Sequence, residues 1–314
     1  MTRLLTRSDL QSVLEPVACI AALRDGFRAA ASPVAGQRVR TDLPFPGTAT
    51  ALIPGVLPGI DAYTVKVNAK FPGARPALRG VICLHSGHDG ELLALIDSAT
   101  VTAWRTGLAA ALGTHVLAGP DSTEDAVLGV VGAGAQAELV MLGLTTLRRR
   151  HEVVVHDSDP DRAGAFASRH GGRLLSSAAE VASAADIVVL ATWSRSPLLR
   201  LADTRPGQHI TSLGADEPGK QELSADLLES ALLVVDDRDL AAATGALAAA
   251  GLAPSAAEAT LGEVLTGAHP GRTSATARSV YAPVGLPWQD LALAWIAYQQ
   301  AEHHDIGQKI DLLS

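Results

Sequence analysis

A glycine-rich segment near the middle of the chain constrains the fold more than any other feature. The apolar run at residues 127–131 stops at a Gly-x-Gly-x-x-Ala pattern made by Gly132, Gly134 and Ala137, and a helical pattern follows. In such a segment the first glycine permits a tight turn, the second lets a phosphate approach the backbone, and the alanine keeps the helix close to the sheet. The free N–H groups at the start of the helix then face an anion. The segment therefore predicts a strand, a phosphate-binding loop and a helix, which is the arrangement of a dinucleotide site.

An acidic residue follows at the distance expected for recognition of a ribose. Asp157 comes directly after the next strand-like run, about twenty residues past the glycines. A carboxylate there accepts hydrogen bonds from the ribose hydroxyls of NAD and disfavours the 2′-phosphate of NADP. Arg162 lies close enough in sequence to keep NADP as the alternative. We therefore expect NAD as the cofactor. The residues expected to hold it in this region are Gly132, Gly134, Ala135, Gln136, Asp157 and Ser158.

Composition and charge exclude several classes of partner. The chain has 314 residues, of which 47% are hydrophobic and 18% charged, and its formal net charge is −8. Nucleic acids and anionic membranes attract basic proteins, so we expect neither as a partner. No uncharged apolar run is long enough to cross a bilayer. The two cysteines, Cys19 and Cys83, form no disulfide framework, and a reducing cytoplasm fits best.

The part of the chain before the glycine-rich segment has a different pattern. Residues 8–30 show helical periodicity, with Ser8 as the expected cap and a second helix start near Pro16. Runs of β type, broken by proline and glycine, fill residues 39–95. Residues 100–117 are helical again. We expect an α+β domain here.

Beyond a boundary near Gly119, strands alternate with helices. This alternation implies an α/β fold with a doubly wound parallel sheet of the Rossmann type. A further β-like run ends near Val284, and an amphipathic helix at residues 287–304 closes the chain. Two domains, with the cofactor at the carboxyl ends of the strands, are the simplest architecture. The expected strands of this sheet are residues 127–131, 151–156, 186–191, 209–213 and 231–235.

Four polar side chains are unusual for their surroundings. Lys66 lies within a β-like run, Arg40 lies in another, and Arg105 opens a helical segment of small apolar residues. Asp216 follows the predicted strand at 209–213, so it should line the edge of the sheet where ligands bind. Each residue alone also has an ordinary explanation, as a solvent-facing strand lysine, a surface arginine or a turn aspartate.

A group of metal-ligand residue types needs a separate interpretation. Cys83, His85, His88 and Asp89 lie within a short span. Two of them alternate on one strand and the other two fall in the turn of a hairpin. A polar hairpin explains the group, and we expect no metal site.

The order and spacing of several motifs make the chain resemble the ornithine cyclodeaminase/mu-crystallin family over nearly its whole length. The two most telling pieces are the Arg-Thr pair at Arg105-Thr106 and the Gly-x-Asp-x-Pro-Gly-Lys loop at residues 214–220. The other matching pieces are Val39-Arg40-Thr41, Val65-Lys66-Val67, Gly132-Ala133-Gly134-Ala135-Gln136 and the end segment Val284-Gly285-Leu286-Pro287-Trp288-Gln289-Asp290-Leu291.

The resemblance implies a role for each of the four polar residues. Arg40, Arg105 and Lys66 would grip the α-carboxylate of an amino or imino acid, and arginine offers a rigid fork for a planar carboxylate. Asp216 would exchange protons near the substrate nitrogen, together with Lys66. Further residues implied at the cofactor are Thr106, Thr192, Gly214 and Lys220.

The resemblance also implies the domain division and the assembly. Residues 1–119 with 287–314 would form the substrate-binding and dimerisation domain. Residues 120–286 would form the NAD-binding domain. Family members are usually dimers joined through the sheets of the substrate domain, so we expect a homodimer.

Three functions are consistent with this resemblance. The first is an NAD(P)-dependent imine reductase or amino-acid dehydrogenase that acts at the α-carbon of a small substrate. The second is a cyclodeaminase, which oxidises ornithine or lysine, releases ammonia and recycles NAD internally. The third is a mu-crystallin-like protein that only binds small molecules. The complete set of catalytic residues argues against the third.

The first two functions differ in the need for a second acid. A cyclodeaminase must hold the distal ammonium of its substrate, but residues 48–58 contain no carboxylate. Asp61 is the nearest acid, and Lys70 adds a positive charge where an ammonium would be unfavourable. We therefore expect the reductase or dehydrogenase.

Overall fold

The chain divides into two compact units in the computed structural model, which describes residues 1–29, 36–71, 73–119, 126–148 and 152–312. The first unit comprises Met1–Thr106 and Leu286–Ser314, and the second comprises Gly107–Gly285. This division falls inside helix α3 (Ser98–Leu117), thirteen residues before the limit expected at 119/120. The helix itself ends at Leu117, close to the Gly-Pro pair that suggested the limit.

The first unit is built on a seven-stranded sheet in the order β17-β1-β6-β5-β4-β3-β2. Strands β2 to β6 pair antiparallel, each with the next, and come from the β-type runs predicted between residues 39 and 95. The other two strands were not predicted. Here β1 pairs parallel to β6 and antiparallel to β17, so both ends of the chain join one sheet edge. The strands are β1 (Thr2–Leu5), β2 (Gln37–Asp42), β3 (Thr48–Gly55), β4 (Ala62–Lys70), β5 (Leu78–Ser86), β6 (Leu92–Asp97) and β17 (Gln308–Ile310).

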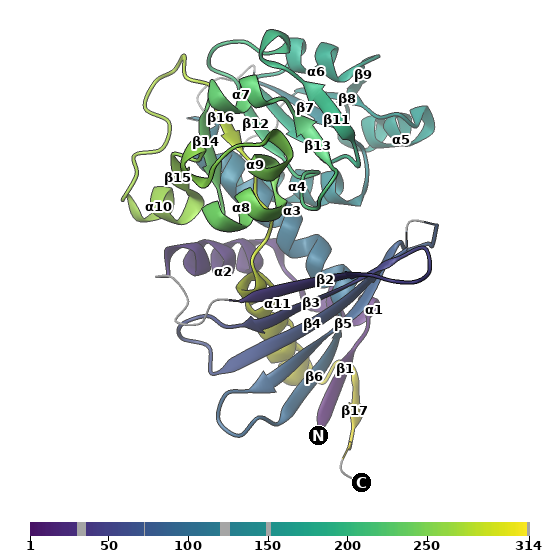
Figure 1. Ribbon diagram of the computed structural model, residues 1–314. Coiled ribbons are helices and arrows are strands. Elements are labelled where there is room, and N and C mark those ends of the chain that lie inside the picture. The colour runs from purple at the N-terminus through teal and green to yellow at the C-terminus, as the bar shows by residue number, and fades with distance from the viewer. Residues whose placement is uncertain (30–35, 72, 120–125, 149–151, 313–314) are drawn as a thin grey trace. The chain divides into compact units, whose positions relative to one another are not determined.

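Three helices complete the first unit together with the start of α3. Helices α1 (Arg7–Val13) and α2 (Pro16–Arg28) follow β1, and α11 (Pro287–His304) has the bounds predicted for the closing helix. Helix α11 packs against β3, β4 and β5, as Figure 1 shows.

The cap of the first helix differs from the prediction. Thr6 is the N-cap, not Ser8, because the Thr6 side chain accepts from the Asp9 N–H while the Asp9 carboxylate accepts from the Thr6 N–H. This reciprocal pair satisfies two backbone donors at once, which a serine inside the first turn cannot do.

The second unit contains an eight-stranded sheet in which every pair is parallel, in the order β15-β14-β16-β12-β10-β7-β8-β9. The predicted doubly wound parallel sheet is therefore confirmed. The strand order reverses between β7 and β10, and such folds bind ligands at the carboxyl ends of the strands at this point. The strands are β7 (Val127–Val131), β8 (Glu152–His156), β9 (Arg173–Leu174), β10 (Ile187–Leu190), β12 (His209–Ser212), β14 (Leu232–Val235), β15 (Ala259–Thr260) and β16 (Ser279–Tyr281).

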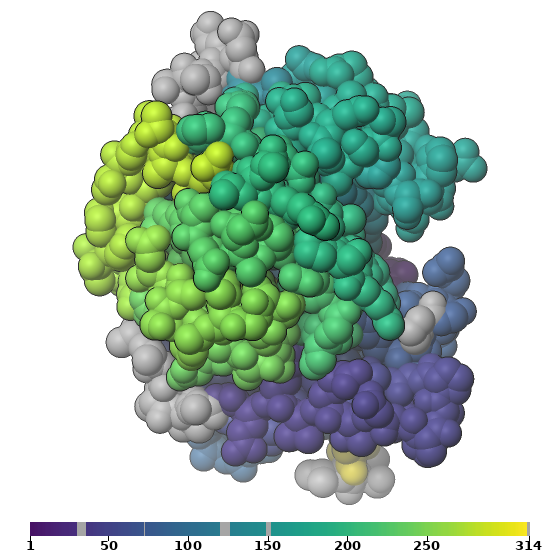
Figure 2. Space-filling model, turned by 45° about the horizontal axis from the view of Figure 1, so that its top comes forward, coloured from purple at the N-terminus to yellow at the C-terminus, as the bar shows by residue number. Residues whose placement is uncertain are grey.

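Helices and a small second sheet cover the parallel sheet. Strands β11 (Arg195–Leu199) and β13 (Gln221–Leu223) form a two-stranded parallel sheet that was not predicted. Helix α10 (Leu261–Thr266) is followed by residues 267–278, most of which lie on the surface (Figure 2). The helices are α4 (Ala135–Leu147), α5 (Pro160–His170), α6 (Ala178–Ala184), α7 (Ala225–Glu229), α8 (Arg238–Thr244), α9 (Ala246–Ala250) and α10 (Leu261–Thr266), with single 3₁₀ turns at Leu201–Asp203 and Pro254–Ala256.

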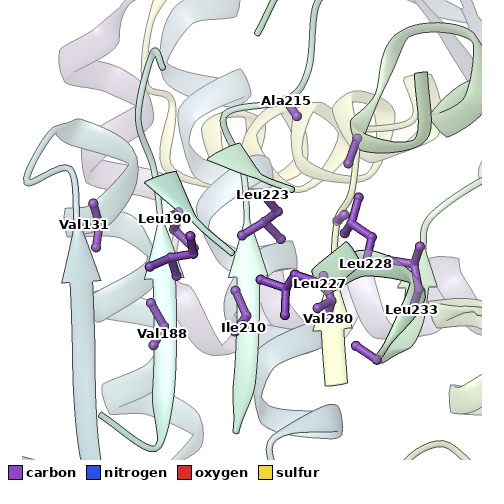
Figure 3. Close-up of a cluster of buried hydrophobic side chains, with 14 of the residues drawn as sticks. Val131, Val188, Leu190, Ile210, Ala215, Leu223, Leu227, Leu228, Leu233 and Val280 are labelled. Carbon is purple, nitrogen blue, oxygen red and sulfur yellow. The ribbon is translucent and has the colours of Figure 1, made fainter. Parts of the chain in front are cut away.

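The core on one face of the parallel sheet is aliphatic. Val188, Ile210 and Val280, from neighbouring strands, lie in one buried cluster with Leu223 and Leu227, as Figure 3 shows. Near-continuous apolar runs of this kind are typical of parallel strands that are buried on both faces. In the described part of the chain no helix is long and apolar enough to span a membrane.

A row of hydrogen-bonded polar side chains lies in the apolar interior of the second unit. His209 is fully buried, with Nδ1 2.9 Å from Ser279 Oγ and Nε2 2.9 Å from Thr211 Oγ1. Burial lowers the pKa of His209 to about 3, and the charges of Arg272 and Arg148 act in the same direction. The imidazole is therefore neutral in the folded protein and links β12 to β16.

Candidate active site

A buried ion pair lies inside the first unit. Lys66 projects from the inner face of β4, and its Nζ donates to both carboxylate oxygens of Asp290 on α11, at 2.9 and 3.0 Å. The two side chains are only 2% and 1% exposed. The ordinary interpretation of Lys66 as a solvent-facing strand lysine is thus wrong, because the alternation of β4 turns Lys66 inwards.

Arg105 joins this pair from helix α3. Its Nε is 3.5 Å from Asp290 Oδ1, and Nη1 donates to Gln289 Oε1 at 3.4 Å. The side chain of Arg105 is only 9% exposed, yet its Nε has no hydrogen-bond partner among the described residues. The sequence suggested that Arg105 opens the helix. It lies instead in the second turn of α3, because the helix begins earlier, at Ser98.

The start of α3 is tied to the same strand that carries Lys66. Ser98 Oγ donates to Asn68 Oδ1 at 2.5 Å, and a side chain at Gly80 would collide with both groups. Asp97 accepts from the N–H and the hydroxyl of Thr100 and so caps the helix. These contacts fix where α3 begins, and with it the position of Arg105.

The surroundings shift the pKa of Lys66. Burial lowers it from its usual 10.5 to about 8, since the ammonium is removed from water. Asp290 opposes this shift, while the positive charges of Arg105 and Arg38 add to it. A lysine with this pKa can give up or take a proton near neutral pH.

The inner face of the sheet carries more cations than the sequence suggested. Arg40 has 32% of its side chain exposed and pairs with Asp42 at 2.9 Å. Arg38 lies one pleat away on the same face, in register with Leu52, which is in turn in register with Lys66. Arg38 was missed because the matching motif draws attention to Arg40 alone.

Asp61 is not placed to supply a second acid near Lys66. It precedes β4, has 80% of its side chain exposed and lies 3.8 Å from His88 at the β5–β6 hairpin. Lys66 is five positions further along the extended chain, which corresponds to roughly 16 Å. The same hairpin holds the residues of metal-ligand type for which no metal site was expected from the sequence. His85 is stacked on Tyr63, and among the described residues no group of three His, Cys, Asp or Glu side chains could hold a metal.

The glycine-rich loop of the second unit has the geometry of a phosphate-binding loop. Gly132 has φ +90°, and a side chain there would collide with the Ala191 carbonyl. A Cβ on Gly134 would meet no atom of the described residues within 4 Å, which leaves the backbone open to a ligand. Helix α4 begins at Ala135 with no side-chain cap, and the buried Gln136 Oε1 has no hydrogen-bond partner among the described residues. These residues fit a dinucleotide phosphate at the helix start.

Asp157 is bound to the glycine-rich loop itself. Its Oδ2 accepts from the Ala133 N–H at 2.7 Å, and Arg162 Nη2 is 3.1 Å from Oδ1. The carboxylate is only 7% exposed, whereas Ser158 beside it is exposed. Asp157 therefore holds the phosphate-binding loop in place, and its recognition of a ribose stays a prediction.

A fully buried acid, Glu222, joins the loops that follow β10 and β12. One oxygen accepts from the N–H and the hydroxyl of Thr192, both at 2.7 Å. The other accepts from Ser212 Oγ and the Gly214 N–H, also at 2.7 Å. Burial raises the pKa of Glu222, while these four donors oppose the rise. The two residues expected near the cofactor, Thr192 and Gly214, are thus held by one carboxylate that the sequence did not single out.

Asp216 pairs with a residue of its own loop. Lys220 Nζ donates to Asp216 Oδ1 at 2.6 Å, and Asp216 has 36% of its side chain exposed. The other residue of the Arg-Thr pair, Thr106, is half-buried and is the last residue of its segment of the first unit. Lys66, Arg105 and Arg40 thus belong to the first unit, and Asp216 belongs to the second.

Comparisons with known proteins agree with the motifs. A family model described as the ornithine cyclodeaminase/mu-crystallin family matches residues 1–305. The chain is 31% identical to an alanine dehydrogenase from Archaeoglobus fulgidus over 98% of both chains. A solved archaeal alanine dehydrogenase dimer with bound NAD has a TM-score of 0.89 and 27% identity, and 99% of both chains is covered.

A second solved structure is similar over the same length. It is the Δ1-pyrroline-2-carboxylate reductase of Thermococcus litoralis in complex with NADH and L-proline. Its TM-score is 0.88 at 25% identity, with 98% of this chain and 100% of that chain covered. The family match, the curated relative and these folds all span nearly the whole chain. The protein therefore belongs to the ornithine cyclodeaminase/mu-crystallin family.

Proposed function

We propose that this protein is an NAD-dependent oxidoreductase that acts at the α-carbon of a small amino acid or cyclic imino acid. It would work as an imine or ketimine reductase or as an amino-acid dehydrogenase. The observation that carries the proposal is the buried group of Lys66, Asp290 and Arg105, in a chain that also has a phosphate-binding loop. The reductase and the dehydrogenase among its relatives support the same class of reaction.

The substrate carboxylate would be held by cations of the first unit. Arg105 offers a planar fork whose Nε lacks a hydrogen-bond partner among the described residues, and Arg40 offers a second fork on the same unit. Two guanidinium groups and an ammonium form strong, directional hydrogen bonds to a carboxylate. They would fix the α-carbon next to Lys66.

The cofactor would be NAD, with NADP as the alternative. Gly132, Gly134 and the start of α4 would hold its phosphates, while Gln136 and the Glu222-bound loops would contact other parts of it. Relatives that bind NAD and NADH support this choice. Arg162 lies beside Asp157, so a 2′-phosphate would meet one positive charge as well as the negative one. When bound, the nicotinamide supplies or accepts a hydride.

Lys66 and Asp216 would handle the proton on the substrate nitrogen. An imine accepts hydride readily only when its nitrogen is protonated, and an amine gives hydride only when its nitrogen is neutral. The Lys66 ammonium, with a pKa of about 8, can deliver that proton. The carboxylate of Asp216 would stabilise the cationic iminium.

The cyclodeaminase reaction is less well supported. Its substrates carry a second ammonium, which needs a carboxylate of its own. Among the described residues of the first unit, Asp290 is already paired with Lys66 and Arg105, Asp42 with Arg40, and Asp61 lies at the distant hairpin. A role in binding alone leaves unexplained why a lysine with a lowered pKa is kept inside the fold.

The assembly and location follow from the same proposal. The outer face of the first unit's sheet exposes Val39 and Val67, at 55% and 47%, and a sheet face of this kind suits a partner sheet. We expect a homodimer, as in the archaeal relative with bound NAD. Both cysteines are free, in agreement with the expected cytoplasmic location.

The test is a substrate panel followed by NADH absorbance. Pyrroline-2-carboxylate, its six-membered homologue and pyruvate with ammonia would be tested for NADH oxidation. Alanine, proline, ornithine and lysine would be tested for NAD reduction, and the two diamino acids also for ammonia release. Turnover of an imine or of a monoamino acid is expected. Ammonia release from ornithine or lysine without net NADH formation would identify a cyclodeaminase instead.

A further inference from the structure

Lys220 is surrounded by acids and an aromatic ring in the second unit. Its Nζ donates to Asp216 Oδ1 at 2.6 Å and lies 3.8 Å from Glu217 Oε2. The ammonium is also 4.8 Å from the ring centre of Trp193. Only 11% of the lysine side chain is exposed, so the cation is engaged by the protein.

The backbone between the two residues brings Lys220 back to Asp216. The Lys220 N–H donates to the Glu217 carbonyl at 3.3 Å, and Gly219 has φ +80°. Proline at the second position and a glycine of positive φ at the third are the signature of a type II turn. The four-residue separation of Asp216 and Lys220 is therefore closed by a defined turn.

The other side of the loop is fixed as well. Glu222 holds the Gly214 N–H two residues before Asp216, and it holds Thr192 immediately before Trp193. The Gln221 N–H donates to the Ser194 carbonyl at 2.9 Å. Asp216 thus lies between two anchored points, and Lys220 holds its carboxylate from one side.

We propose that Lys220 is a positioning residue for Asp216, which orients the carboxylate and stabilises its negative charge during the reaction. The proposal rests on the function proposed above, in which Asp216 faces the substrate nitrogen. It differs from the cofactor contact that the family resemblance implied for Lys220. A phosphate would have to approach an ammonium that already has two carboxylates within 3.8 Å, and their negative charge opposes it.

The indole of Trp193 contributes to the same arrangement. A cation over an aromatic face is attracted by the ring quadrupole, which restricts where the ammonium can lie. Trp193 has 57% of its surface exposed, so it is not required for the core. Replacing it should weaken the hold on Lys220 without unfolding the unit.

The experiment compares Lys220→Met, Lys220→Arg, Asp216→Asn and the double variant Asp216→Asn/Lys220→Met. The matched control is Lys309→Met, because Lys309 forms the same type of pair with Asp305, four residues away at 2.7 Å. For each protein we would measure kcat and KM with the best imine of the panel, and the Kd for NADH by fluorescence. Hydrogen–deuterium exchange of residues 213–220 would be measured without substrate.

The proposal expects a specific pattern. Lys220→Met should lower kcat about tenfold or more, the effect of one lost charge-assisted hydrogen bond, with the NADH Kd changed less than about threefold. Lys220→Arg should restore most of the rate, and Trp193→Leu should give a smaller loss. In the Asp216→Asn background the lysine substitution should have no further effect. Exchange in the loop should rise in Lys220→Met and stay unchanged in Lys309→Met.

Other results would overturn it. A tenfold weaker NADH affinity at unchanged kcat would assign Lys220 to the cofactor. Additive losses in the double variant would mean that the two residues act independently. Unchanged exchange in Lys220→Met would exclude the positioning role, even if no substrate of the panel is turned over. Absence of turnover in the unmodified protein, by contrast, would count against the proposed function.

Discussion

Lys66 and Asp290, 224 positions apart in the sequence, meet as a two-pronged ion pair inside the first unit. The strand supplies the cation and the last long helix supplies the anion. Such a pair is costly to bury, and removing one partner leaves the other charge without compensation. It therefore sets both the stability of this unit and the proton chemistry expected at the site.

The pH dependence of the reaction should follow Lys66. Its pKa lies at about 8 in the folded protein. If the ammonium protonates the imine, kcat/KM for imine reduction should be level below pH 8 and fall above it. The reverse oxidation needs the neutral amine and should rise through the same range. Initial rates between pH 6 and pH 10 check this. A reductive profile that is flat to pH 10 would contradict the role of Lys66.

Asp290→Asn should destabilise the first unit strongly. It leaves the Lys66 ammonium buried without its counter-charge, so the free energy of unfolding should fall by about 3–5 kcal/mol. Glu152→Gln is the control, because Glu152 forms an exposed pair with Arg173 and its loss should cost less than about 1 kcal/mol. Urea unfolding followed by circular dichroism measures both. Equal effects of the two substitutions would show that the buried pair is not important for stability.

Arg105→Lys should damage turnover although the charge is kept. A single ammonium cannot reproduce the fork that contacts Gln289 and Asp290 and that would hold the substrate carboxylate. The expected loss in transition-state stabilisation is about 2–4 kcal/mol, seen in kcat/KM. Arg173→Lys serves as the control for the same exchange, because Arg173 forms an exposed pair with Glu152 on the second unit. Unchanged kinetics in Arg105→Lys would exclude the proposed carboxylate contact.

Asp157 should favour NAD over NADP. Two substitutions separate its charge from its hold on the loop. Asp157→Asn can still accept from the Ala133 N–H, so it should lose mainly the discrimination against NADP. Asp157→Ala should also loosen the loop and weaken both cofactors. Dissociation constants for NADH and NADPH check this. A tenfold preference of the unmodified protein for NADPH, about 1.4 kcal/mol, would overturn the prediction.

The buried His209 should make the protein sensitive to mild acid. Its pKa is about 3 in the folded state and 6.5 in the unfolded chain, so the unfolded state binds more protons between these values. Stability is complete above pH 6.5 and should fall by about 1 kcal/mol per pH unit below it. His209→Gln should lessen this slope between pH 6.5 and 5, whereas the exposed His303→Gln should not. Chemical unfolding at several pH values gives the slopes.

The limits of single helices and strands could be predicted from the sequence more accurately than the pairing of distant strands. The strand Val127–Val131 and the helix Pro287–His304 could be predicted to the residue, because periodicity, glycines and a proline mark their limits. The edge pairing of β1 with β17 could not, since it joins two short segments from opposite ends of the chain. For the first helix the signal existed, because Thr6 and Asp9 have capping-box spacing.

The same distinction applies to the candidate site. Lys66 and Arg105 were recognisable as polar residues in apolar surroundings, and motif spacing added Asp216. Asp290 and Glu222 were not singled out, because each acts on residues of other elements. The one available sign for Asp290 was its own position, as an acid directly before the apolar run of α11. Nothing local distinguishes Glu222 from a surface glutamate.

The construction of the first unit from both ends of the chain has a consequence for synthesis on the ribosome. Strands β1 to β6 and the first part of α3 emerge early, yet the carboxylate that compensates Lys66 arrives only with α11. Until then the nascent sheet has a lysine on its inner face without a counter-ion and without the helix that covers β3, β4 and β5. The second unit, which is continuous in sequence, can fold during this interval. Completion of the first unit is thus postponed until the second unit has been synthesised.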